Sequence, residues 1–205
     1  VKTRERYFDF LRKLRIYLPK GLTLSATIRL HQVKFREQTG VPPADRGMLM
    51  YYNMGRVDDT TEVNSILRTD VGARYLQRLD AYPLPLDAAL PLFCWGVVFR
   101  KGRLVHLLHG LERESLQDSS YFRPTAHGRY RVRRGTWRKG VFLYPGDELR
   151  WEGVSRETLQ LAARQLARTL PADERHVVFY HLDSAILSHF SHEDLLQTQA
   201  IFQDP

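Results

Sequence analysis

The sequence predicts an α/β fold in which helices and strands alternate along the chain. Three observations lead to this prediction. Apolar residues recur at spacings of three and four in several segments, as in amphipathic helices. Runs rich in apolar and β-branched residues lie between those segments, as in strands. Glycine- and proline-containing turn signals separate the two kinds of segment. The 205 residues suffice for one substantial core and one insertion.

The first part of the chain is predicted to alternate regularly. The expected elements are a helix over 4–18, a strand over 22–30, a short helix over 33–39, a strand over 47–54 and a helix over 71–79. Each helix is followed by a residue that ends helices: Pro19 and Gly21 after the first, Gly40 after the second and Pro83 after the third.

The second part contains a segment of different character. Residues 88–99 are predicted to form one long apolar strand, and Pro91 inside it indicates a bulge or a strand start. Short strand candidates then follow at 104–108, 129–132, 141–144 and 148–152, which predicts a small antiparallel unit. After it, Ser155 is the expected N-cap of a helix that ends at Pro171. A strand over 176–183 and a helix over 192–202 close the chain.

Strands that alternate with helices favour right-handed βαβ units and a parallel sheet. Four such strands are half of a (β/α)8 TIM barrel, which has eight strands and roughly 200–250 residues. We therefore predict a TIM-barrel-like half-barrel of strands five to eight, formed by residues 1–101 and 154–205. Residues 102–153 are the predicted antiparallel β insertion after strand seven. Because the chain opens on Val1 without an initiator methionine, we expect the N-terminal half of the barrel to be missing from it. An open four-stranded α/β sheet is the alternative.

The charge of the chain raises the question of nucleic-acid binding. The formal net charge is +8, and 25 of the 31 basic residues are arginine. These residues are spread over the whole chain, with one dense cluster in the segment 129–139. Basic and apolar residues alternate over 129–134, which indicates a solvated strand face. The sequence therefore disfavours a nucleic-acid partner but keeps this segment as a third functional alternative.

Other classes of function lack a sequence signal. No run of about 18 apolar residues is present, so no transmembrane segment is predicted. Cys94 is the single cysteine, which excludes an internal disulfide and a cysteine-based zinc site. The spacing of His181, His189 and His192 matches no recognised zinc pattern. We therefore expect neither a metal nor another cofactor.

Polar and aromatic side chains lie at the predicted ends of the strands, where barrels of parallel strands bind their ligands. In residues 48–55 (MLMYYNMG), a short apolar run ends in two tyrosines and an asparagine. Asp183 follows the last strand and is the one candidate for a catalytic carboxylate, with a helix N-cap as its alternative role. The predicted substrate-binding residues are Tyr52, Asn53, Trp95, Tyr180, Asp183 and His31.

The four strands resemble strands five to eight of chitinase-type glycoside hydrolases. Residues 22–27 (LTLSAT) resemble the fifth strand, and residues 50–53 resemble a Met-x-Tyr-Asp sixth strand with Asn53 in place of the aspartate. Residues 89–96 resemble a seventh strand with the pattern Gly-x-Pro-x-Tyr-Gly. Phe179 and Tyr180 lie where the eighth strand usually has a tryptophan. A closer resemblance, to an uncharacterised bacterial family of glycoside-hydrolase-like TIM-barrel proteins, is carried by residues 25–31, 48–55 and 88–96.

The resemblance implies a carbohydrate-active protein that binds or hydrolyses a glycan, from a bacterial cell envelope or secreted. In chitinases the catalytic acid is a glutamate at the tip of strand four, within an Asp-x-x-Asp-x-Asp-x-Glu motif. This chain contains no such motif, so the resemblance places the main acid upstream of residue 1. Asn53 also lacks the charge of the aspartate that it replaces. A non-catalytic barrel that has lost its acids and binds a glycan or a protein is therefore the alternative.

Overall fold

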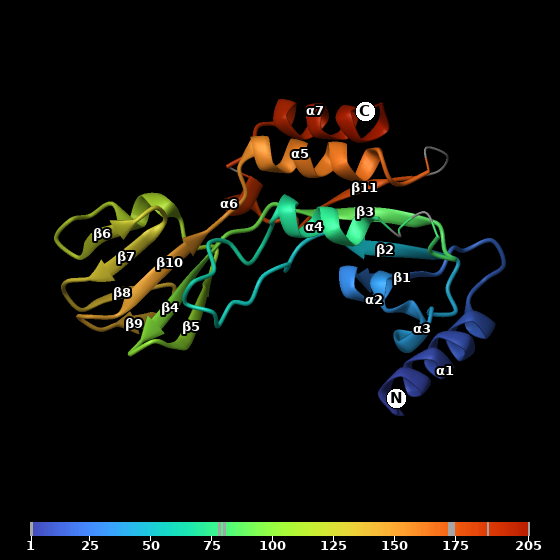
Figure 1. The fold of residues 1–205 in the computed structure, drawn as a ribbon, viewed down its shortest axis with the longest axis horizontal. Helices are drawn as coiled ribbons and strands as arrows, with labels where there is room; N and C mark the ends of the chain where they lie inside the picture. Colours follow the sequence, from blue (N-terminus) through green and yellow to red (C-terminus); the bar gives the residue numbers. More distant parts are fainter. Residues whose placement is uncertain (1, 78, 80, 172–174, 188, 205) are drawn as a thin grey trace.

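A computed structural model describes residues 2–77, 79, 81–171, 175–187 and 189–204. The described chain contains a parallel sheet covered by helices and an antiparallel sheet beside it (Figure 1). The elements are α1 (Lys2–Tyr17), β1 (Ser25–Arg29), α2 (Leu30–Lys34), α3 (Arg36–Thr39), β2 (Arg46–Met50), α4 (Thr69–Leu76), β3 (Leu86–Pro91), β4 (Trp95–Arg100), β5 (Arg103–His109), the 3₁₀ helix η1 (Arg113–Leu116), β6 (Phe122–Ala126), β7 (Arg129–Val132), β8 (Thr136–Arg138), β9 (Val141–Leu143), β10 (Glu148–Glu152), α5 (Arg156–Ala167), β11 (Val177–Tyr180), α6 (Ser184–Leu187) and α7 (His192–Gln203).

The parallel sheet has the strand order β1-β2-β3-β11, and each pair of neighbours is parallel. Helices α4 and α5 pack beside each other, α5 contacts β3, and α7 lies on the outer side of α5 (Figure 1). The main hydrophobic core fills the space between this sheet and these helices. The mixed α/β fold predicted from the alternating pattern is confirmed at this level.

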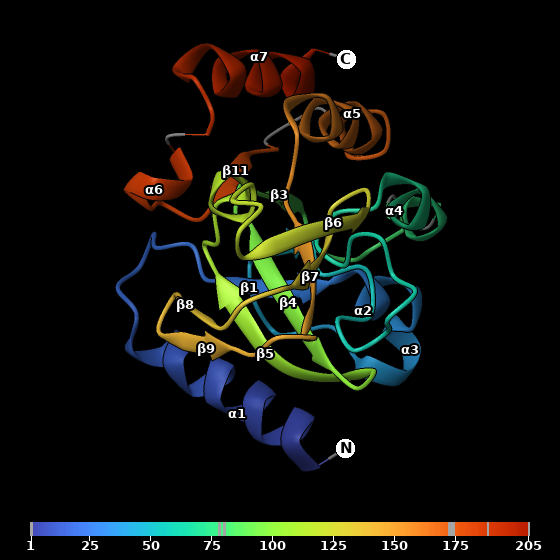
Figure 2. The ribbon, with the colours of Figure 1, turned by 90° about the vertical axis from the view of Figure 1, so that its left-hand side faces the viewer.

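The antiparallel sheet has the order β5-β4-β10-β7-β6, with the β8–β9 hairpin beside it (Figure 2). It encloses a second, smaller core that includes Val98, Leu116 and Phe122. The prediction of one strand over 88–99 was wrong, because the run is divided between the two sheets. Strand β3 ends at Pro91, which has no backbone N–H to continue a ladder, and β4 begins at Trp95 in the antiparallel sheet.

Several element boundaries differ from the predicted ones for local reasons. The short helix expected over 33–39 is two helices that meet at Phe35, and Gly40 ends the second with a positive φ of 74°. Strand β2 stops at Met50, and Asn53 beyond it adopts a left-handed conformation with φ of 55°. The N-cap prediction is confirmed, since the Ser155 side chain accepts a hydrogen bond from the Thr158 N–H.

Tyr51 fixes the packing of β2 against the helices. Its side chain is completely buried, and its hydroxyl donates to Oε1 of Gln165 on α5 at 3.0 Å. A Cβ atom at Gly72 on α4 would lie 2.2 Å from the Tyr51 oxygen, so this close approach requires glycine. Successive side chains of an extended segment point to opposite sides. The Tyr51 ring therefore faces the helices, and Tyr52 faces the other side of the sheet.

No helix in the described part of the chain combines the length and the apolar character needed to cross a membrane.

Asp87 joins three strands at the amino-terminal end of the parallel sheet. Its carboxylate on β3 accepts two hydrogen bonds from Arg46 on β2, at 2.7 and 3.0 Å. It also accepts from the backbone N–H of His176, just before β11, at 3.0 Å. Burial alone would raise the pKa of Asp87, but the hydrogen bonds from Arg46 and His176 outweigh it and hold the pKa below its ordinary value.

We expect this carboxylate to make stability depend on pH. Because the folded pKa lies below the unfolded value of about 3.9, the stabilisation is complete above that pH and is lost as the pH falls through the folded pKa. Urea unfolding at pH 6 and at pH 3 measures this loss. Asp87→Asn should be less stable than wild type at pH 6 and should lose less stability between the two pH values. An unchanged pH dependence in the variant would contradict this role.

Candidate functional site

Two tyrosines meet at the carboxyl-terminal ends of the parallel strands. Met50 pairs with Ala89, and Tyr180 pairs with Pro91, so the register places Tyr52 and Tyr180 on either side of Pro91. Their rings stack across β3 with centroids 5.2 Å apart and planes within 4°. The exposed fraction is 8% for Tyr52 and 45% for Tyr180, so Tyr180 presents its ring to solvent while Tyr52 supports it.

The segment that connects the two sheets extends this aromatic cluster. The Phe93 ring meets Tyr52 edge-on at 5.8 Å and Tyr180 edge-on at 5.9 Å. Trp95, the first residue of β4, lies 5.2 Å from Phe93 and 5.8 Å from the ring of His109. Edge-to-face contacts of this kind stabilise aromatic clusters beyond the area that they bury. The cluster therefore forms a continuous apolar wall from the parallel sheet to the antiparallel sheet.

A cavity of about 430 Å³ opens beside this wall. Five of the six predicted binding residues line it: Tyr52, Asn53, Trp95, Tyr180 and Asp183. The sixth, His31, lines an adjoining hollow of about 360 Å³ that shares Met50, Tyr52 and Asn53 with the cavity. The structure thus brings five of these residues together and places His31 next to them. Their role in binding remains a prediction.

Tyr52 can donate a hydrogen bond at the cavity wall over a wide pH range. Burial, assisted by the neighbouring Tyr180, raises the pKa of Tyr52 to about 12. The hydroxyl therefore stays protonated at neutral pH. Asn53 adds an exposed amide at the same strand end, with one acceptor and two donor hydrogens.

Trp95 is held in place by the buried carboxylate of Glu152 at the end of β10. The indole Nε1–H donates to Oε2 of Glu152 at 2.9 Å. The same oxygen accepts from the backbone N–H of Ser65 at 2.7 Å and from its hydroxyl at 2.6 Å. Oε1 accepts from Nε of Arg150 at 2.6 Å, and both charged side chains are almost completely buried. Trp95 is 6% exposed, so it forms the floor of the cavity.

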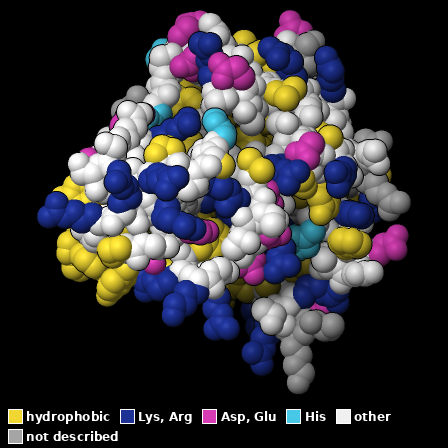
Figure 3. All heavy atoms as spheres, turned by 60° about the vertical axis from the view of Figure 1, so that its left-hand side comes forward, with side chains coloured by type: hydrophobic (Ala, Val, Ile, Leu, Met, Phe, Trp, Pro, Cys, Tyr) yellow, Lys and Arg dark blue, Asp and Glu magenta, His cyan; other side chains and the backbone are white. Residues whose placement is uncertain are grey.

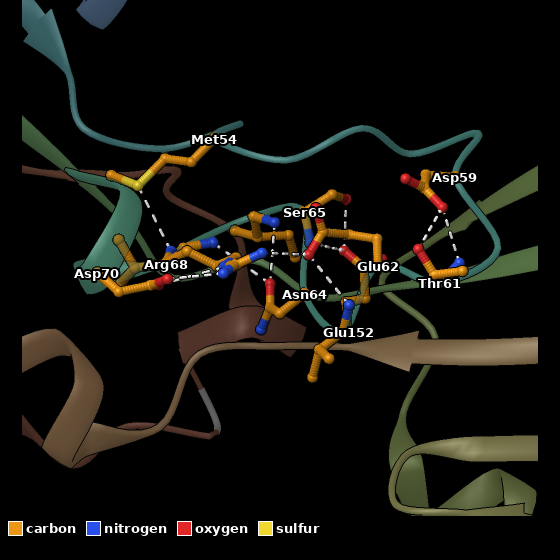
Figure 4. A network of polar contacts seen from close by, with 12 residues as sticks. Met54, Asp59, Thr61, Glu62, Asn64, Ser65, Arg68, Asp70 and Glu152 are labelled. Carbon is orange, nitrogen blue, oxygen red and sulfur yellow. Dashed lines mark hydrogen bonds and ion pairs between the residues drawn. The ribbon is translucent and has the colours of Figure 1, made fainter. Parts of the chain in front are cut away.

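The same ion pair fastens the loop between β2 and α4 to the antiparallel sheet. Arg150 donates to the carbonyl oxygens of Val57 and Asp59 at 3.0 and 2.6 Å. Asn64 donates to the carbonyl of Gly153 at 2.8 Å and accepts from two backbone N–H groups of its own loop. Figure 4 shows Asn64, Ser65 and Glu152 within this network. The loop that follows Asn53 is therefore anchored along its length.

Asp183 acts as a helix N-cap, the alternative role expected for it. Its Oδ1 accepts a hydrogen bond from the Ile186 N–H, in the first turn of α6, at 3.3 Å. It also lines the cavity, and it is the one carboxylate among the described lining residues. A single carboxylate at this position can orient a ligand or accept a proton. It does not provide the pair of carboxylates that glycoside cleavage usually requires.

The predicted binding residues do not include the other described lining residues, among them Phe93, His109, Lys139 and His181. Phe93 lay in a recognised apolar run, but only the change of sheet at Pro91 turns it towards the tyrosines. His109 ends β5 of the antiparallel sheet and Lys139 lies in the turn of the β8–β9 hairpin, and no local signal gives their direction. The Nδ1 atom of His181 is buried without a hydrogen-bond partner, and its ring packs against Phe93.

The cavity shows no features of a reactive thiol or a metal centre in its described residues. Cys94 lines it, but burial raises the pKa of this thiol despite the opposing effect of Lys139. The described residues contain no group of three or more His, Cys, Asp or Glu side chains that could hold a metal ion. His189 and His192 do not lie among the described residues of the cavity wall.

Several arginines of the basic segment 129–139 form contacts within the protein. Arg129 donates to the carbonyl of Glu62, Arg131 pairs with Glu148, and Arg133 donates to the carbonyl of Ser119. Arg138 stacks over the ring of Phe122 at 5.1 Å. Figure 3 shows lysine and arginine side chains on this side of the molecule interspersed with other kinds. Nucleic-acid binding gains no support from these contacts and stays a third alternative.

The comparisons with known proteins identify the fold. No protein-family model matches the chain, and no curated protein matches it in sequence. A chitinase from Chromobacterium violaceum matches 96% of this chain with a TM-score of 0.57 and 16% identity. The Group IV chitinase of Ostrinia furnacalis matches 98% with a TM-score of 0.51 and 12% identity. The spore cortex-lytic enzyme SleL of Bacillus cereus matches 93% with a TM-score of 0.50 and 15% identity.

These matches confirm the distant resemblance to chitinase-type glycoside hydrolases at the level of the fold. The chain spans 62% of the Chromobacterium chitinase, 63% of the Ostrinia chitinase and 47% of the Bacillus enzyme. At these identities the likeness concerns the arrangement of the elements.

Replacing Glu152 by glutamine tests the anchor beneath the cavity. The change preserves shape but leaves the Arg150 charge buried without its partner, so we expect a loss of about 3–5 kcal/mol in unfolding free energy. Glu148→Gln, in the same strand, removes only the half-exposed pair with Arg131 and should cost less than about 1 kcal/mol. Equal losses in the two variants, measured by denaturant unfolding, would show that the buried pair has no special role.

Proposed function

We propose that this chain forms strands five to eight of a glycoside-hydrolase-type (β/α)8 barrel. Strands β1, β2, β3 and β11 take these places within the predicted ranges 1–101 and 154–205. The insertion after strand seven, predicted over 102–153, also includes β4, which pairs in the antiparallel sheet. The parallel order β1-β2-β3-β11 supports this arrangement, because it follows the order in the chain and leaves β1 and β11 as the two edges. The helix that follows β2, α4, packs against α5, which itself contacts β3.

We further propose that the cavity at the strand ends binds a glycan. The observation that carries this proposal is the stacked pair of Tyr52 and Tyr180, whose outer ring is partly exposed at the wall of a cavity of suitable size. Ligand sites typically combine an apolar, aromatic lining with a few polar groups that fix orientation. Here the aromatic wall offers a face for a sugar ring, while the Tyr52 hydroxyl and the Asn53 amide supply hydrogen bonds for its edge.

Binding and cleavage make different demands on this site. Glycoside hydrolysis usually uses two carboxylates, separated by about 5–5.5 Å in retaining and about 6.5–9.5 Å in inverting enzymes. The described lining supplies Asp183 alone, and the Asn53 amide cannot act as an acid or as an anionic stabiliser. We therefore propose that residues 1–205 bind and orient the glycan. In this account, any cleavage depends on an acid outside these residues, and without one the protein is a glycan-binding barrel.

Removing the exposed ring tests the proposal. Tyr180→Ala deletes the partly exposed member of the stack, and we expect glycan affinity to fall about tenfold or more, as for aromatic anchors in other interfaces. The matched control is Tyr17→Ala, because Tyr17 is 84% exposed on α1 and lies among none of the described lining residues. Calorimetric titration with glycans from a panel that includes chitin hexamer measures both variants against wild type.

Comparing the two variants distinguishes glycan binding at the cavity from non-specific binding to the protein surface. Retained affinity in Tyr180→Ala, or an equal loss in Tyr17→Ala, would contradict binding at this cavity. Binding without turnover would favour the non-catalytic alternative over an enzyme.

A further inference from the structure

The tip of the β8–β9 hairpin brings a lysine to the cavity. Lys139 and Gly140 form the two-residue turn between these strands, with φ angles of 46° and 75° that match a tight hairpin turn. Lys139 lines the cavity, and its Nζ lies 3.9 Å from where a Cβ on Gly110 would be. The β8–β9 hairpin therefore contributes an ammonium group to a site whose other walls are largely aromatic.

This ammonium group has no ionic partner in the described part of the chain. Glu112 and Glu114 are close enough to influence Cys94 electrostatically, but neither lines the cavity nor pairs with Lys139. Asp183 is the only carboxylate on the described lining, and one of its oxygens accepts from the Ile186 N–H. A charged group left without a partner beside an apolar wall gains most from a ligand of opposite charge.

The adjoining hollow adds a second positive charge that has no ionic partner among the described residues. Arg29 lines it together with His31, and Arg29 forms no ion pair within the described residues. At the rim shared by the two hollows, Asn53 is uncharged. Among the described residues that line the combined space, the fixed charges are two cations and one carboxylate. Three histidines add further hydrogen-bonding groups: His31, His109 and His181.

We infer that the cavity takes a glycan that carries carboxylate groups, such as a uronic-acid-containing chain, and that Lys139 determines this specificity. The inference rests on the proposed glycan-binding function and narrows its ligand class. An aromatic wall accepts the ring of a neutral or an acidic sugar alike. The unpaired Lys139 ammonium and the Arg29 guanidinium distinguish between them, because only the acidic sugar supplies a counter-charge.

Paired ligands and paired variants test the inference. The probes are hyaluronan hexasaccharide and hexagalacturonate, each beside its carboxyl-reduced counterpart, with affinities measured by calorimetric titration. Lys139→Gln is compared with Lys101→Gln. Lys101 also precedes a glycine in a hairpin turn, has φ of 51° and is exposed, but lines neither hollow. We expect at least one carboxylated probe to bind better than its reduced form. Lys139→Gln should weaken that binding roughly fivefold, the reduced probe should be unaffected, and Lys101→Gln should behave as wild type.

The outcomes distinguish the two levels of the proposal. Equal binding of the carboxylated and reduced probes would overturn the specificity while the glycan-binding function stands. The same loss in Lys101→Gln and Lys139→Gln would also overturn it, because the effect would then be one of net charge. If neither the acidic nor the neutral glycans of the panel bind, the glycan-binding function fails, and the specificity fails with it.

Discussion

The buried carboxylate of Glu152 is the point at which the two sheets and the candidate site depend on one another. Glu152 is the last residue of β10 in the antiparallel sheet. Its carboxylate accepts hydrogen bonds from Ser65, in the loop that follows β2, and from the indole N–H of Trp95. Arg150 forms an ion pair with this carboxylate and donates hydrogen bonds to the backbone carbonyl oxygens of Val57 and Asp59 in the same loop. A buried ion pair is tolerated only when its remaining hydrogen-bonding capacity is used. Here that requirement fixes how the antiparallel sheet sits on the parallel one.

The cavity is a consequence of this attachment. Tyr52 and Tyr180 stack because the register of three parallel strands places them on either side of Pro91. Alone, these rings would form a small apolar patch at one end of a sheet. Phe93 and Trp95 turn the patch into a wall, and the hairpin tip at Lys139 adds a cation at its edge. The residues that line the cavity thus come from both sheets and from the β8–β9 hairpin, and contacts outside the cavity hold Trp95 in place.

The sequence analysis predicted what depends on local pattern. The twofold period of an extended segment and the parallel arrangement together place Tyr52 and Tyr180 at one end of the sheet, and the structure brings them into contact. The prediction failed where the chain passes from the parallel sheet to the antiparallel sheet. Residues 88–99 are uniformly apolar, so their composition does not reveal that β3 and β4 belong to different sheets. The approach of Lys139 to the cavity depends on how a whole hairpin packs, which no short pattern encodes.

The most direct measurement is hydrogen exchange of the backbone amides with and without a saturating glycan from the panel. The account predicts added protection in the segments that line the cavity, namely residues 51–55, 92–96, 109–110, 139–140 and 180–186, and little change elsewhere. Protection confined to the basic segment 129–134, or to the amino-terminal ends of the parallel strands near Asp87, would contradict it. Either result would show that the glycan binds elsewhere than at the paired tyrosines.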